Sequence, residues 1–167
     1  MSALFSKSCK YGFQAVLYLA TQESVRPLRL KDIASALHLP YDFLSKIFQK
    51  LSRGGIVRSQ KGQHGGFVLA RSAETITLND IVVAIDGVDS HNQCVLGFPG
   101  CSDLQSCSAH SYWKAILQIV AQMLNEKNVA DLSRGIEAKI ALLNPAPRKR
   151  AKPDTLSVMK RQPQTQQ

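Results

Sequence analysis

The spacing of apolar residues predicts three amphipathic helices in the first third of the chain. Apolar side chains recur every three or four positions over residues 3–21, 28–37 and 41–53, which is the spacing of one helix face. Pro40 suits the start of the third helix, and Gly54 suits its end. The inward positions of that helix are Phe43, Leu44, Ile47, Phe48 and Leu51. Two short helices joined by a tight turn, the second with a polar and cationic outer face, match a helix-turn-helix.

A pair of β-prone runs follows the third helix. Residues 56–59 and 66–70 are separated by the glycine-rich stretch 60–65, which predicts a hairpin with a cation near its tip. A solvated helix hairpin is a commoner structure than a DNA-reading helix pair. A β-ribbon beside the helix at residues 41–53, however, is typical of a winged helix. Lys61 and His64 would then reach a DNA backbone or a minor groove.

The second half of the chain predicts three more helices. Residues 77–85 form a short helix with Thr77 as its cap, and a further helix with an apolar face starts near Asn128. Residues 111–126 have apolar side chains over more of the helix surface than one buried stripe requires. We therefore expect a second face of this helix to pack against another subunit in a homodimer.

These patterns divide the 167 residues into four parts. We expect a winged helix-turn-helix DNA-binding domain at 1–86, a ligand loop at 87–110, dimerisation helices at 111–143 and a disordered basic tail at 144–167. The tail holds four of the seven prolines and lacks the apolar residues needed for a core. The predicted fold class is mainly α with a small β-wing, followed by a long C-terminal dimerisation helix.

Charge is distributed unevenly along the chain. The net charge of +9 divides into +1 over residues 1–25, +7 over residues 26–71, −4 over residues 72–143 and +5 in the tail. A basic segment in front of an acidic body indicates a protein that presents one face to a polyanion. No apolar run reaches the roughly 18 residues of a membrane span. Gln14 also interrupts the one stretch that resembles a signal peptide, so we expect a cytoplasmic protein.

Three cysteines and a histidine gather in the loop after the fourth helix. Cys94, Cys101, Cys107 and His110 have the spacing C-x6-C-x5-C-x2-H, whereas Cys9 lies apart on an apolar helix face and is expected to be a small buried side chain. Thiolate and imidazole are the donors that iron–sulfur clusters and zinc select. The odd local count argues against disulfides. Structural zinc generally uses tight pairs of cysteines, so the spacing favours a cluster and leaves zinc as the alternative.

The helix-turn-helix, the glycine-rich wing and the loop cysteines together resemble the IscR and NsrR family of winged-helix regulators, also called the Rrf-two family. The resemblance extends from residue 1 to about residue 143. Each piece is weak alone, but the combination is highly specific. The matching stretches are residues 11–19, 32–34, 43–47, 61–71 and 78–86.

Members of this family that have all three cysteines bind a cluster, so the resemblance implies Cys94, Cys101 and Cys107 as cluster ligands. Nitric-oxide-sensing members add a carboxylate from the first helix, but this chain has no Asp or Glu before Glu23. The iron–sulfur assembly regulators use a histidine three residues after the third cysteine, which is the place of His110. The resemblance thus implies a 2Fe-2S centre. The first cysteine gap is one residue longer here than in the best-matched members, so a 4Fe-4S centre is the alternative.

The resemblance implies a homodimeric transcriptional regulator, in our interpretation a repressor, that binds a near-palindromic DNA operator. Its operator affinity would be controlled by a cluster that senses iron–sulfur status, redox state or nitric oxide. We expect base or nearby phosphate contacts from the outer face of the third helix. The residues are Tyr41, Ser45, Lys46 and Gln49. Phosphate contacts that position the protein are expected from Lys50, Arg53, Arg58 and Lys61, with His64 beside them on the wing.

Two other functions use the same residues differently. A small iron–sulfur carrier or redox protein would dock an acidic partner on the basic segment and would not bind DNA. A zinc-stapled regulator would bind DNA without sensing through a cluster. The sequence offers no Ser-His-Asp arrangement and no paired carboxylates, so we do not expect an enzyme.

Overall fold

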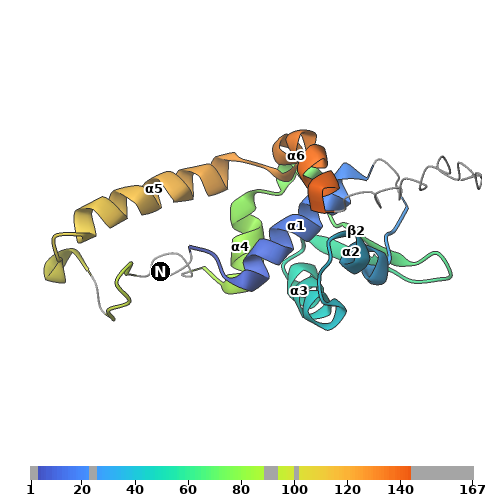
Figure 1. Ribbon diagram of the computed structural model, residues 1–167, viewed down its shortest axis with the longest axis horizontal. Coiled ribbons are helices and arrows are strands. Elements are labelled where there is room, and N and C mark those ends of the chain that lie inside the picture. Colours follow the sequence, from blue (N-terminus) through green and yellow to red (C-terminus); the bar gives the residue numbers. More distant parts are fainter. Residues whose placement is uncertain (1–3, 23–25, 89–93, 100–101, 144–167) are drawn as a thin grey trace, which may run out of the picture.

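A computed structural model describes residues 4–22, 26–88, 94–99 and 102–143. Figure 1 shows α1 to α4 and the β-ribbon gathered in one body, from which α5 extends as an arm, while α6 lies next to α1. This arrangement confirms the expected fold class of a mainly helical protein with a small antiparallel ribbon. The elements are α1 (Lys7–Thr21), α2 (Leu30–Ala36), α3 (Tyr41–Arg53), β1 (Val57–Gln60), β2 (Gly66–Leu69), the 3-10 helix η1 (Ala73–Thr75), α4 (Leu78–Asp86), the 3-10 helix η2 (Asp103–Gln105), α5 (His110–Glu126) and α6 (Val129–Leu143).

Helix α1 is the centre of the packing and contacts α3, α4 and α6. The sequence predicted that it starts at residue 3, but the first helical residue is Lys7. The difference has a local cause, because the side chain of Ser6 accepts a hydrogen bond from the backbone N–H of Cys9 at 3.0 Å and so caps the helix there. Gly12 allows the close approach of α4, since a Cβ at this position would lie 2.1 Å from Ile85 Cδ1.

Helices α2 and α3 form the expected helix-turn-helix. Leu44, Ile47, Phe48 and Leu51 of α3 are buried, and each such side chain contributes about 1.5–3 kcal/mol to folding. Helix α3 spans residues 41–53, as the sequence predicted, with Pro40 as its N-cap rather than its first helical residue. The opposite face of α3 is thereby left to solvent.

The wing is a two-stranded ribbon with a third strand segment beside it. Val57 pairs with Leu69 and Gln60 with Gly66 in the antiparallel register. Leu28 joins them, because its N–H donates to Phe67 O at 3.0 Å and its carbonyl accepts from Phe67 N at 2.7 Å. Leu28 was expected to belong to the second helix, but this pairing keeps it extended and α2 starts at Leu30.

The start of α4 is fixed by a capping box. The Thr77 side chain accepts from the Asp80 N–H at 3.1 Å, and Asp80 Oδ2 accepts from the Thr77 N–H at 3.0 Å. Arg71 adds an ion pair to Asp80 at 2.7 Å. Burial would raise the pKa of Asp80, but the bonds from Thr77 and the Arg71 guanidinium outweigh it and lower this pKa below its usual value.

Asp80→Ala is expected to lower the free energy of unfolding at pH 7 by about 1 kcal/mol, because the capping box loses its carboxylate. A carboxyl with a depressed folded-state pKa stabilises the protein above its unfolded pKa of about 3.9, and this stabilisation is lost as the pH falls through the folded-state pKa. Urea unfolding followed by circular dichroism, at constant protein concentration, measures the difference at several pH values. Glu74→Ala removes a nearby exposed carboxylate as the control. An equal deficit for Asp80→Ala at pH 7 and at pH 3 would contradict this explanation.

Helix α5 is joined to the core only near its C-terminal end. Leu124 is its one fully buried residue, and the backbone beyond it is anchored where the Leu78 N–H donates to Lys127 O at 3.1 Å. The Val129 N–H donates to Ile76 O at 2.8 Å and fixes the start of α6. The rest of α5 extends away from the body, as Figure 1 shows.

Candidate nucleic-acid interface and ligand loop

The outer face of α3 presents the four residues expected to contact bases or nearby phosphates, together with Arg53, which was expected to contact a phosphate. Tyr41, Lys46, Gln49 and Arg53 are exposed, and Ser45 is half-buried. They come to one side because the apolar positions of α3 are turned into the core. Hydroxyl, amide, ammonium and guanidinium groups are the side chains that hydrogen-bond to base edges and phosphates in a major groove.

A shallow groove separates α3 from the ribbon. Ser45, Gln49 and Arg53 line it from α3, and Ser59 and Phe67 line it from the strands. Phe67 also packs edge-on against Phe48 of α3, with ring centroids 4.7 Å apart, so this contact fixes the ribbon relative to the helix. Ser59 had not been identified from the sequence, because its place in the groove depends on how the ribbon packs.

Beyond the groove the ribbon carries three exposed cationic or titratable side chains. Arg58 lies on β1, and Lys61 and His64 lie in the turn between the strands. All three were expected at a DNA-facing wing, and their exposure leaves them accessible to a duplex.

Lys50 has a different position from the other cations of α3. Its Nζ donates a hydrogen bond to the backbone carbonyl of Ile85 at 2.7 Å. Ile85 is in the last turn of α4, whose carbonyl groups attract a cation. Lys50 was expected to contact a phosphate, whereas the structure gives its ammonium an acceptor inside the domain. Lys50 therefore ties the candidate recognition helix to the end of α4.

The end of α4 is held from a second side by α1. Ser6 donates through Oγ to Asp86 Oδ1 at 2.6 Å, and its backbone N–H lies 3.3 Å from Asp86 Oδ2. A Cβ on Gly54, after α3, would lie 2.6 Å from Ala84 Cβ, so the helices meet without a gap. The ligand loop begins at Gly87, directly after Asp86, the last residue of α4. The start of the loop therefore lies directly after these contacts with α1 and α3.

Three of the four candidate metal ligands, Cys94, Cys107 and His110, lie in the described parts of this loop. Cys94 is half-buried and Cys107 is exposed, and the His110 N–H donates to Cys107 O at 3.0 Å at the start of α5. Cys101 lies outside the described residues. Among the residues that the structure does describe, no three His, Cys, Asp or Glu side chains form a group able to hold a metal ion.

Asp103 is a further polar residue at this place. His110 Nε2 lies 3.0 Å from Asp103 Oδ1, and Lys114 Nζ donates to Asp103 Oδ2 at 2.7 Å. Hydrogen bonds from Lys114 and then His110 lower the pKa of Asp103, so the group is an ionised acceptor at neutral pH. Nε2 must then carry the proton, and in the neutral ring Nδ1 has the lone pair. The side chains of Asp103 and His110 fit a metal centre in this respect, since a ligating histidine usually gives its other N–H to a carboxylate.

Cys9 is excluded as a ligand by its surroundings. Its side chain is 0% exposed inside α1, as expected from the apolar stripe. Burial, and then the charge of Asp86, raise the pKa of this thiol to about 12. At neutral pH it is therefore protonated, whereas metal binding needs a thiolate.

One face of α5 is apolar and open to solvent in the single chain. Tyr112, Ile116, Ile119 and Met123 have exposed fractions of 77%, 46%, 68% and 42%. They follow one another at intervals of four, three and four residues, so they form one stripe along the helix.

No helix in the described part of the chain is both long and apolar enough to cross a lipid bilayer.

Comparison with known structures supports the winged-helix assignment. CymR, the global cysteine regulator of B. subtilis, superimposes with a TM-score of 0.66 at 25% identity, over 78% of this chain and 95% of CymR. IscR of T. potens gives a TM-score of 0.64 at 25% identity, over 83% of this chain and 92% of that protein. Both likenesses extend over most of the chain.

Sequence comparison leads to the same class of protein. The protein rrf2 of Nitratidesulfovibrio vulgaris is 30% identical over 125 residues, which are 75% of this chain and 83% of that protein. The HTH-type transcriptional regulator IscR of Erwinia tasmaniensis is 27% identical over 123 residues, 74% of each chain. IscR is a transcriptional regulator and not an enzyme. Residues 5–135 match the family model for Rrf2, described as an iron-dependent transcriptional regulator, and the chain therefore belongs to the Rrf2 family of transcriptional regulators.

Proposed function

We propose that this regulator binds its operator as a homodimer and that an iron–sulfur cluster controls the affinity. The cluster ligands are Cys94, Cys101, Cys107 and His110. The single observation that carries the proposal is the contact of the α4 end with α1 and α3, directly before the loop that contains these ligands.

DNA recognition uses the outer face of α3 and the wing. Tyr41, Ser45, Lys46 and Gln49 reach base edges or nearby phosphates from the outer face of α3, while Arg53, Arg58 and Lys61 contact phosphates. In a two-fold dimer the two α3 helices enter successive major grooves, which are about 34 Å apart along the duplex. Two half-sites with this spacing define the operator.

The dimer is formed through the apolar stripe of α5. Four exposed apolar side chains along one helix face are unusual for a soluble monomer and typical of a subunit interface. The helix projects beyond the body of the chain and so is able to reach a second copy (Figure 1). The two winged helix-turn-helix domains of the dimer, its DNA-binding heads, are then held at a separation set by the two α5 helices.

Coupling between the loop and the DNA-binding face passes through the end of α4. When the cysteines and the histidine of the loop bind a cluster, the loop is ordered and Gly87 is held in place. Asp86 and Ile85 then keep their hydrogen bonds to Ser6 and Lys50. When the loop is released, these bonds are weakened and α3 is less well positioned. Coupling free energies of about 1–3 kcal/mol correspond to a change in affinity of roughly 5- to 150-fold.

The cluster supplies a redox-active and labile centre, which is what distinguishes a sensor from a structural staple. Cys107 and His110 lie next to each other at the start of α5, and Asp103 fixes the orientation of the imidazole. The resemblance to the iron–sulfur assembly regulators, in which a histidine takes the place of His110, favours a 2Fe-2S centre, with a 4Fe-4S centre as the alternative. Both a cysteine regulator and IscR share this fold, so the donor set, rather than the fold, selects the signal.

Binding to operator DNA should depend steeply on salt. We expect the affinity to fall by about 10³-fold or more between 50 and 200 mM salt, because six or more phosphate contacts release counterions. Fluorescence anisotropy with a labelled operator duplex, in a series of salt concentrations, measures the slope. An iron–sulfur carrier that uses the basic segment to dock an acidic protein predicts no binding to duplex DNA at any of these concentrations. That result would exclude the regulator.

A further inference from the structure

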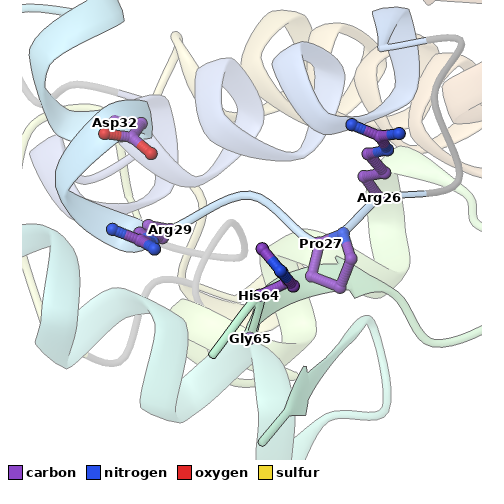
Figure 2. Close-up of a pocket in the computed structure, with 6 residues that line it drawn as sticks. All are labelled: Arg26, Pro27, Arg29, Asp32, His64 and Gly65. Atoms are coloured by element: carbon purple, nitrogen blue, oxygen red, sulfur yellow. The ribbon is translucent and has the colours of Figure 1, made fainter. Parts of the chain in front are cut away.

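A hollow at the side of the wing is lined by no residue of α3, and of its lining residues only His64 was expected to contact DNA. It is lined by Arg26, Pro27, Arg29, Asp32, His64 and Gly65. Figure 2 shows Arg26 and Arg29 at opposite ends of the hollow, with the ring of His64 between them. The side chains come from the segment before α2, from α2 itself and from the turn of the wing. Two parts of the chain that are far apart in sequence thus build one cationic surface.

The walls of the hollow are held by backbone contacts. A Cβ on Gly66 would lie 2.4 Å from Leu28 O, and one on Gly65 would lie 2.5 Å from Gln60 O, so larger residues would push the turn away. Arg29 Nη2 also donates to the carbonyl of Gln63 at 3.2 Å and connects the N-cap of α2 to the turn. Arg29 is therefore held against the turn that carries His64 before any ligand binds, which lowers the entropy cost of binding.

The charge of the hollow is positive. Arg26 and Arg29 outnumber the single carboxylate, Asp32, and within the described residues none of the three takes part in an ion pair. The bond to Gln63 uses one of the five N–H donors of the Arg29 guanidinium. Its remaining donors, with those of Arg26, have the planar geometry that suits two oxygens of a phosphate group.

We propose that this hollow binds a backbone phosphate of the operator, outside the grooves contacted by α3 and the wing tip. The inference rests on the proposed DNA binding and adds to it a contact made by Arg26, Arg29 and His64. A DNA phosphate is favoured over a free anion because the hollow is open and joins the wing turn that carries Lys61, in the segment of residues 26–71 with net charge +7. An isolated phosphate ion would gain only these contacts. A phosphate in a duplex is held near the hollow by the rest of the protein–DNA interface, which raises its effective concentration there.

Three single variants test the contact: Arg26→Gln, Arg29→Gln and His64→Ala. Each should weaken binding equally for the operator and for an unrelated duplex, because phosphate contacts do not depend on sequence. For the two arginine variants we expect roughly tenfold weaker binding and a decrease of about 1 in the slope of log K against log salt. Lys127→Gln removes the same charge at an exposed position between α5 and α6 and should change neither quantity.

A neutral methylphosphonate, placed in turn at each linkage beside the wing, identifies the phosphate. One position should weaken the wild type and have no further effect on Arg29→Gln, since the same contact is already lost. Arg29 also holds the turn, so Arg26→Gln and His64→Ala separate phosphate binding from wing placement. If Arg29→Gln alone weakens binding, or if no linkage shows this non-additivity, the hollow is not a phosphate site.

Calorimetric titration of the free protein with inorganic phosphate distinguishes a site for a DNA phosphate from a site for a free phosphate ion. We expect no saturable binding below millimolar concentration. Saturable binding that Arg29→Gln abolishes would show a site for free phosphate and overturn the assignment to DNA. A wild-type protein that does not bind duplex DNA at all would instead refute the proposed function. Salt-steep binding that all three variants retain unchanged would refute only this further inference.

Discussion

A variant with Cys94, Cys101 and Cys107 all changed to Ala is expected to be colourless after anaerobic purification and to bind the operator about 5- to 150-fold more weakly. The three substitutions remove every loop thiolate, and His110 alone does not retain a cluster. Without its ligands the loop no longer holds Gly87, so the contacts at the end of α4 are weakened. Visible absorption, iron and sulfide analysis and operator anisotropy measure the two effects on the same sample.

Cys9→Ala is the matched control for this experiment. Its thiol is buried and protonated, so the variant should keep the colour, the iron content and the operator affinity of the wild type. In the wild type, two irons per chain indicate a 2Fe-2S centre and four indicate the larger cluster. Colourless wild-type protein with bound zinc would support the zinc-stapled regulator. If the triple variant kept both the absorption and the operator affinity, the sensing proposal would have to be abandoned.

Local patterns account for the parts of the fold that were predicted correctly. The apolar spacing of residues 41–53 gave α3 with its correct ends, because its buried face, proline cap and terminal glycine all act within a few residues. Thr77 was identified as the cap of α4 for the same reason. The error at Leu28 has the opposite cause, since its extended conformation depends on pairing with Phe67, which is far away in the sequence.

The candidate site was predictable in its residue types but not in its connections. Exposed Lys46 and Gln49 follow from the helical period alone. Lys50 has the same charge as Lys46, yet its ammonium binds Ile85 O because α4 packs beside that edge of α3. Asp103 gave no signal in the sequence, since its contact with His110 depends on the path of the loop into α5. Contacts of this kind can be identified only from the tertiary structure.

Ile119→Asp is expected to make the protein monomeric and to weaken operator binding by about 10²- to 10⁴-fold, which is the advantage of binding two linked half-sites. Ile119 is 68% exposed in the single chain and lies in the middle of the α5 stripe. In the proposed dimer a carboxylate at this position would be buried without a partner, which costs several kcal/mol at each of two symmetric sites. Sedimentation velocity gives the oligomeric state, and anisotropy gives the affinity for full and half operators.

The size of the affinity loss follows from how the two DNA-binding heads are connected. Once one head of a dimer is bound, the second meets its half-site at a high effective concentration, and a monomer loses this advantage. The loss should therefore be confined to the full operator, and binding to an isolated half-site should change little. Asn125→Asp places the same charge on the opposite side of α5 and should remain dimeric. A dimeric Ile119→Asp variant would show that α5 is not the interface, while a monomer with wild-type operator affinity would show that the paired heads are not needed.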